Sequence, residues 1–301
     1  MIHGFIIVDK PAGITSHDVV SRVRRIAGTR KVGHTGTLDP FATGVLPVAI
    51  NDGTKAIPFL DEGSKCYEAV MQVGVATDTL DMTGTLLRES EYGHISLSQI
   101  QAACQRFIGP ILQTPPMYSA IKQGGQPLYK LARQGVEVER AARPVEIYSL
   151  EITSCTLPFV SFTVHCSRGT YVRTLADDIG TVLGTGAALK ELRRTASGPF
   201  LMASARTLGE LEAAAEAGTL ADHCISPLYA LAHLNELELS EVGLKKVSFG
   251  RSPLREDVSG VFPESERQLV RLSRSDSLVA VAEITVASEI GPIITLKRVF
   301  I

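Results

Sequence analysis

The sequence lacks a hydrophobic run long enough to cross a lipid bilayer, and its first residues lack the basic start and apolar core of a secretory signal peptide. Its 5 cysteines are widely spaced and form no Cys-x-x-Cys pair, which argues against a disulfide framework and indicates reduced thiols. The 7 histidines show no metal-ligand spacing. We therefore expect a cytoplasmic protein without membrane contact and without a metal site.

Length and composition are those of a globular protein. With 301 residues, 45% hydrophobic and 21% charged, the chain can bury a large core in one or two domains. A net charge of −2 does not by itself indicate a nucleic-acid partner. The basic residues nevertheless cluster, at Arg22, Arg24, Arg25, Arg30 and Lys31, at Arg140 and Arg143, at Arg168 and Arg173, and at Lys190, Arg193 and Arg194. These clusters could form one basic face, although a solvated helix face explains any single cluster equally well.

Side chains that can take part in chemistry are most concentrated between Gly33 and Pro40, in the sequence GHTGTLDP, which contains an imidazole, two hydroxyls and a carboxylate. An apolar run at 43–50 follows at once, so the stretch is expected to be a polar loop on a rigid hydrophobic support. Asp39 precedes a proline, which favours an extended backbone and would let its carboxylate point into a cleft. The alternative is an ordinary turn in which the Asp39 side chain caps its own backbone.

Hydrophobic periodicity predicts several regular elements around this loop. We expect strands at 4–10, 65–74, 145–154 and 159–166, and helices that start near Thr15 or Ser16 and after Ser96. Further helices are expected at 127–134, from an opening within 167–180 with a buried stripe at 172–183, and at 208–217. Segments 77–84 and 113–122 are expected to be turns or loops, and segment 192–200 is expected to exit into a turn. After Leu234 short strand-like runs replace this pattern, which predicts a small β-rich unit with its boundary near Asn235.

Five motifs stand in order along the first two-thirds of the chain. They are DKPAGITSHD at 9–18, GHTGTLDP with ATGVL at 33–46, KCY with TDT at 65–79, PPMYSA at 115–120, and RGTYVRTL with LRRT at 168–195. Together they resemble the TruB family of tRNA pseudouridine synthases, over Gly4 to Phe200. The unit after 234 is similar only in length and strand content to the small RNA-binding domain, called PUA, that ends bacterial members.

The resemblance implies an α+β fold, with a mixed, largely antiparallel sheet flanked by helices and a small β-rich C-terminal PUA-like domain. It implies a catalytic domain at 1–234, with an RNA-binding insertion around 110–145, and an RNA-binding domain at 235–301. The implied reaction converts a uridine in the T-loop of tRNA, position 55 in bacteria, to pseudouridine.

The resemblance also assigns roles to single residues. Asp39 would be the catalytic carboxylate, and Arg173 its partner. Tyr67 would stack on the target base and help to remove the C5 proton. Tyr171 and Leu192 would shape the base pocket, and His34 would assist extrusion of the base from the RNA.

These residue types suit the chemistry. Breaking the N1–C1′ bond and rejoining the base through C5 transfers no net electrons, so we expect no cofactor. A carboxylate can act as the nucleophile, on the sugar or on the base. A closed pocket would raise its pKa, and a buried arginine would offset that rise. The base must be flipped out of its stack, at a cost of a few kcal/mol, and stacking on an aromatic ring can return roughly 1–3 kcal/mol.

Other functions stay open at this stage. A non-catalytic tRNA-folding chaperone could keep the same cleft, and an N-glycosidase could use the same carboxylate and base pocket to release the base. A phosphate-binding loop is remote, because neither Gly-x-x-x-x-Gly-Lys-Ser/Thr nor Gly-x-Gly-x-x-Gly occurs near Asp39. As partner we expect the T-arm of tRNA, with no protein partner and a monomeric enzyme.

Overall fold

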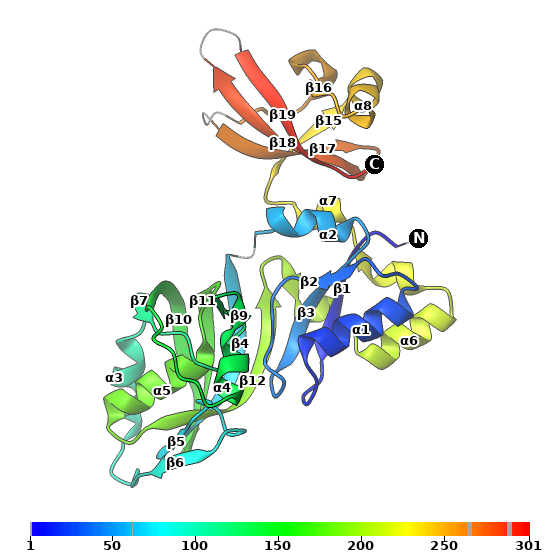
Figure 1. Ribbon diagram of the computed structural model, residues 1–301. Helices are drawn as coiled ribbons and strands as arrows, with labels where there is room; N and C mark the ends of the chain where they lie inside the picture. Colours follow the sequence, from blue (N-terminus) through cyan, green and yellow to red (C-terminus); the bar gives the residue numbers. More distant parts are fainter. Residues whose placement is uncertain (1, 62, 264–266, 288–290) are drawn as a thin grey trace.

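The computed structural model describes residues 2–61, 63–263, 267–287 and 291–301 (Figure 1). Its largest element is a ten-stranded sheet, which confirms the predicted mixed, largely antiparallel architecture. In spatial order its main path is β14 (Cys224–Ile225), β1 (Gly4–Lys10), β3 (Thr43–Ile50), β12 (Ala187–Ser197), β4 (Ser64–Val73), β11 (Phe159–Ser167), β10 (Arg143–Thr156) and β7 (Gly109–Gln113), while β2 (Val32–His34) pairs with β3 and β13 (Phe200–Leu201) with β12. The pairing of β3 with β12 is parallel, and the other pairings in this sheet are antiparallel.

Four helices pack on one face of this sheet and bury the main hydrophobic core with it. They are α1 (Ser16–Ile26), α3 (Leu97–Gln105), α5 (Val172–Leu183) and α6 (Leu208–Glu216). The N-termini of α1, α3 and α6 carry capping boxes, in which a Ser or Thr hydroxyl and the residue three positions later satisfy free backbone N–H groups. The predicted helix starts at Thr15 and Ser96 are thereby confirmed.

The turn predicted within 192–200 lies at its end, at Gly198 and Pro199. Residues 192–197 before it belong to β12, a central strand that was not predicted. It was missed because Arg193 and Arg194 resemble surface residues. Arg194 is in fact completely buried, since backbone carbonyls satisfy its guanidinium group.

Two segments between strands of this sheet form small structures outside it. The segment 74–90 contains the hairpin β5 (Val75–Thr77) and β6 (Leu86–Glu89). The segment 114–142, between β7 and β10, contains β8 (Lys122–Gln123), β9 (Gln126–Pro127) and α4 (Leu128–Arg133), close to the helix predicted there. We call the segment 114–142 the insertion.

A second sheet begins with β15 (Asn235–Leu239) and has five strands. The others are β16 (Val258–Ser259), β17 (Arg267–Arg274), β18 (Ser277–Ala287) and β19 (Gly291–Val299), with α8 (Glu241–Ser248) packed beside them. The predicted β-rich C-terminal unit is thus confirmed, whereas the assignment of a separate RNA-binding function to it stays a prediction.

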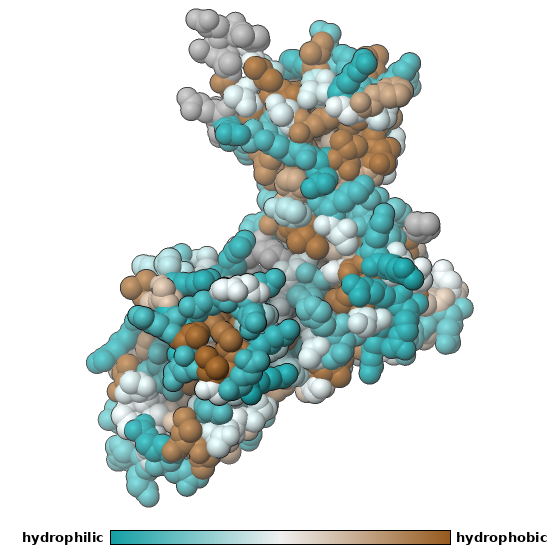
Figure 2. Space-filling model, viewed as in Figure 1, coloured by the Kyte–Doolittle hydropathy of each residue, from teal (hydrophilic) through white to brown (hydrophobic). Residues whose placement is uncertain are grey.

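The two sheets meet at a narrow junction, visible in Figure 2. A shared apolar cluster fills that junction, with Phe5, Ile7 and Phe200 from the larger part and Val281 and Phe300 from the smaller. The short helices α2 (Gly53–Ala56) and α7 (Pro227–Ala230) lie beside this cluster. Among the described helices, none is long and apolar enough to cross a membrane.

Candidate active site

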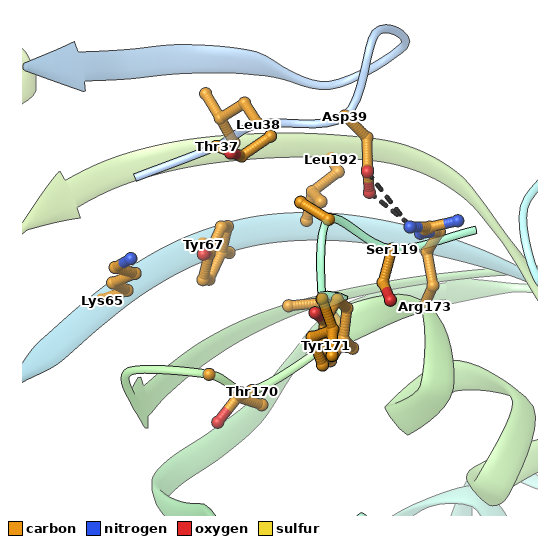
Figure 3. Close-up of a pocket in the computed structure, with 14 residues that line it drawn as sticks. Thr37, Leu38, Asp39, Lys65, Tyr67, Ser119, Thr170, Tyr171, Arg173 and Leu192 are labelled. Atoms are coloured by element: carbon orange, nitrogen blue, oxygen red, sulfur yellow. Dashed lines mark hydrogen bonds and ion pairs between the residues drawn. The ribbon is translucent and has the colours of Figure 1, made fainter. Parts of the chain in front are cut away.

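A cavity of about 350 Å³ opens where several separate segments of the part with the ten-stranded sheet converge (Figure 3). Its walls come from the loop after β2, from β4, from the insertion, from the start of α5 and from β12. Five of the six residues predicted from the sequence lie in its lining, namely Asp39, Tyr67, Tyr171, Arg173 and Leu192. The fold thus brings Asp39 and Leu192, which are 153 positions apart in the chain, to one site.

Asp39 and Arg173 form a two-point ion pair. The Arg173 Nε lies 2.9 Å from Asp39 Oδ2, and Nη2 donates to Asp39 Oδ1 at 3.0 Å. The carboxylate side chain is 30% exposed, whereas that of Arg173 is only 4% exposed. The alternative in which the Asp39 side chain caps its own turn is wrong, because the N–H of Ala42 donates to the Asp39 backbone carbonyl instead.

Arg173 is held by more than Asp39. Its Nη1 lies 3.3 Å from Asp81 Oδ2 and donates to the Thr79 carbonyl at 3.0 Å, while Nη2 also donates to the Tyr118 carbonyl at 2.8 Å. Asp81 is itself buried and accepts hydrogen bonds from Thr83. The guanidinium is therefore fixed from both sides, and its orientation toward Asp39 is set before any substrate arrives.

Burial raises the pKa of Asp39 above its ordinary value. Arg173 and Lys10 act in the opposite direction, and the negative charge of Asp81 adds to the rise. The guanidinium thus favours the ionised carboxylate in a site that would otherwise favour the neutral acid.

Two buried cations hold the loop that carries Asp39, and sequence reasoning missed both. Lys10 Nζ donates to the carbonyls of Pro40 and Ala42, at 3.1 and 2.7 Å. Arg194 donates through Nε to Val45 O at 2.7 Å and through Nη2 to Gly36 O at 3.1 Å. Lys10 belongs to the first quoted motif and Arg194 to the last, but nothing local in the sequence shows that they act on one loop.

Tyr67 lies on β4, and its ring lines the cavity between Lys65 and Leu192 (Figure 3). Burial raises the pKa of its phenol to about 12, while Arg194 acts in the opposite direction. The ring therefore presents an apolar face and a protonated hydroxyl at neutral pH.

Tyr171 and Leu192 lie on either side of the same cavity. Tyr171 is the residue before the first turn of α5, so α5 brings both Tyr171 and Arg173 to the cavity. Leu192 projects from β12, opposite Ala69 of β4, and adds to the apolar lining.

His34 does not line the cavity. It ends β2, and its ring meets that of His17 edge-on, with the ring centres 5.5 Å apart. Burial, together with the nearby His17, Arg194 and Lys65, lowers the pKa of His34 to about 4. The imidazole is therefore neutral at pH 7 and lies outside the cavity lining that contains Asp39.

The basic cluster at 190–194 does not form a basic face. Arg194 is buried, and Arg193 makes a bidentate pair with Asp9, with Nη2 2.8 Å from Oδ2. Lys190 lies over the ring of Phe159. Within the described ranges, no group of three or more His, Cys, Asp or Glu side chains could hold a metal ion.

Comparison with known proteins places the chain in a family. Residues 24–172 match the model of the TruB family pseudouridylate synthase N-terminal domain, and residues 173–232 match that of the tRNA pseudouridylate synthase B C-terminal domain. Both matched segments end before β15, so the second sheet lies outside them.

Relatives and solved structures agree with these matches. The tRNA pseudouridine synthase B of Geotalea uraniireducens (strain Rf4) is 56% identical, over 93% of this chain and 91% of that protein. The protein of the same name from Bacillus pumilus (strain SAFR-032) is 43% identical, over 90% and 89%. A chain in the crystal structure of a Cbf5-Nop10-Gar1 complex is 29% identical, with a TM-score of 0.77 over 99% of this chain and 85% of that one. The protein therefore belongs to the TruB family of pseudouridylate synthases.

Proposed function

We propose that this protein is a tRNA pseudouridine-55 synthase, which isomerises the T-loop uridine of tRNA. The observation that carries the proposal is the Asp39 carboxylate, paired with the buried Arg173 and set beside the ring of Tyr67 in an open cavity. Relatives that share up to 56% of its residues over most of the chain bear the name tRNA pseudouridine synthase B. The T-arm stem-loop is the proposed substrate region.

Asp39 is the nucleophile of the proposed reaction. It attacks either C1′ of the ribose or the base itself, and the N1–C1′ bond breaks. The base turns within the cavity, and C5 forms a new bond to C1′. The bond between Asp39 and C1′ or the base then breaks and regenerates the carboxylate, C5 loses its proton and N1 gains one, so atoms and electrons balance without a cofactor. The reaction requires the ionised carboxylate, which Arg173 favours.

Tyr67 receives the extruded base on its ring. Its phenol is protonated at neutral pH, because its pKa is about 12. Proton removal from C5 by Tyr67 would first require loss of its own proton, so stacking is its main role. Tyr171 and Leu192 shape the pocket, and the neutral His34 assists extrusion from outside the cavity lining.

RNA reaches the cavity through surfaces outside it. The insertion contributes Ser119, Ala120 and Ile121 to the lining and therefore lies where a bound T-arm would pass. The exposed Arg22, Arg25 and Arg30 meet backbone phosphates, and the unit at 235–301 adds further RNA contacts. We place the enzyme in the cytoplasm as a monomer without a protein partner.

A T-arm hairpin with tritium at C5 of the target uridine tests the proposal. Tritium release with the base still attached to the RNA supports the isomerase. Free uracil would indicate an N-glycosidase. Tight binding of an unchanged hairpin would indicate the tRNA-folding chaperone.

A further inference from the structure

Gln113 is a buried polar residue that has no role in the proposed reaction. It ends β7 and is only 3% exposed. Its side chain does not pair with another side chain but with the backbone of Tyr171, 58 positions later in the chain.

Both polar atoms of the Gln113 amide are engaged. The Tyr171 N–H donates to Gln113 Oε1 at 2.7 Å, and Gln113 Nε2 donates to the Tyr171 carbonyl at 3.1 Å. The two bonds fix which amide atom is oxygen and which is nitrogen, because the N–H can only donate and the carbonyl can only accept. A carboxylate or a hydrocarbon of similar size cannot make both.

The pair sits at the start of α5. Tyr171 precedes the helix, and its side chain provides no cap there. The Tyr171 carbonyl also accepts the first helical bond, from the N–H of Leu175. Gln113 therefore fixes the backbone from which the Tyr171 ring enters the cavity and from which Arg173 follows two residues later.

Gln113 also directly precedes the insertion. The chain runs from it to Tyr118, whose carbonyl accepts from Arg173, and to Ser119, which lines the cavity. The Gln113 side chain thus links the start of the insertion to Tyr171 through two hydrogen bonds. Arg173 ties the insertion to Asp39 a few residues further on.

We propose that Gln113 is a positioning residue for the reaction, which sets the Tyr171 ring and Arg173 against Asp39. The proposal rests on the proposed function, because it assumes that a base reacts in this cavity. A displacement of about 1 Å at a reacting centre can reduce a rate about 100-fold, even when the substituted residue never touches the substrate. Gln113 should therefore affect the chemical step far more than RNA affinity.

The test compares single-turnover tritium release and hairpin affinity in Gln113→Glu and Gln113→Met. At a pH where the introduced carboxyl is ionised, Gln113→Glu keeps the acceptor for the Tyr171 N–H and loses the donor, whereas Gln113→Met loses both bonds. We expect the rate to fall at least about tenfold in Gln113→Glu and further in Gln113→Met, with Kd for the hairpin changed less than about twofold.

Asn51→Asp is the matched control. Asn51 is also a buried amide that donates to a backbone carbonyl, that of Ile2, and it lies outside the cavity lining. Its conversion to a carboxylate should leave the rate within about twofold of the parent protein at equal folded fraction, measured by thermal unfolding.

Two results would overturn the proposal. One is a parental rate in folded Gln113→Glu, and the other is an equal loss of rate and affinity, which would make Gln113 part of RNA docking. If Gln113→Met does not fold, Gln113→Glu decides the question. Failure of the parent protein to release tritium would instead reject the proposed function, so the two failures are distinguishable.

Discussion

Arg173 is shared between two carboxylates, and this sharing defines the electrostatics of the site. Asp39 faces the cavity, whereas Asp81 lies behind the guanidinium and is buried. Asp81 raises the pKa of Asp39 through its charge and at the same time orients the arginine that lowers it. The two effects act in opposite directions on the pKa of the same carboxylate.

Replacement of Asp81 separates these effects. In Asp81→Asn the nearby negative charge is gone, so the pKa of Asp39 should fall and the acidic limb of the rate profile should move to lower pH. The measurement is single-turnover rate against pH. Asp78→Asn, in the same turn, is the control and should leave the limb in place. A shift to higher pH would mean that orientation of Arg173 outweighs the charge.

Tyr67 allows a second test at the level of one residue. Because the pKa of its phenol is about 12, the hydroxyl stays protonated between pH 7 and 10. Tyr67→Phe keeps the stacking ring, so we expect the same alkaline profile as the parent protein over this range. Tyr67→Leu removes the ring and should weaken binding of the extruded base by roughly 1–3 kcal/mol. A limb near pH 9 that disappears in Tyr67→Phe would contradict the assignment.

At the scale of the element, the parallel pairing of β3 with β12 supports the loop that carries Asp39. Gly44 has φ +102°, and a Cβ there would lie 2.2 Å from the Arg194 carbonyl. This close approach lets Arg194 reach Val45 and the loop before Asp39. A glycine is required, since any side chain would push the two strands apart.

Gly44→Ala should therefore destabilise the protein by about 3 kcal/mol or more. The measurement is the free energy of unfolding in urea. Gly93→Ala is the control, because a Cβ at Gly93 meets nothing within 4 Å and should change stability by less than about 0.5 kcal/mol. Similar stabilities for the two variants would show that the strands can separate without loss.

The elements and the site were predictable from the sequence to different degrees. Amphipathic patterns and caps located α1, α3 and α5, because those signals are local. The strand at 187–197 was missed, since its buried Arg194 breaks the apolar pattern. Asp81 and Gln113 were missed because their roles depend on partners 92 and 58 positions away.

At the scale of the whole molecule, the two sheets share a hydrophobic cluster rather than a bare linker. Phe300 is 8% exposed and packs into that cluster, and its N–H donates to Val279. Arg271 of β17 donates to the Leu228 carbonyl at 2.6 Å, across the same junction. The C-terminal unit therefore packs directly against the part that contains the ten-stranded sheet.

Because the two sheets share this cluster, we expect them to unfold together in a single transition. Phe300→Ala should lower the free energy of unfolding by about 3 kcal/mol and shift the loss of both sheets together. Val261→Ala, at a residue 80% exposed, is the control and should have little effect. Two separate thermal transitions in calorimetry would show that the junction does not couple the sheets.

Tritium release from C5 by Asp39→Asn, measured in a single turnover with a labelled T-arm hairpin, tests the central claim most directly. The substitution keeps the shape of the side chain and removes its charge. We predict a rate reduced at least about 10⁴-fold, with hairpin affinity within a few-fold of the parent protein. Release within tenfold of the parental rate would show that the Asp39 carboxylate is not the reactive group.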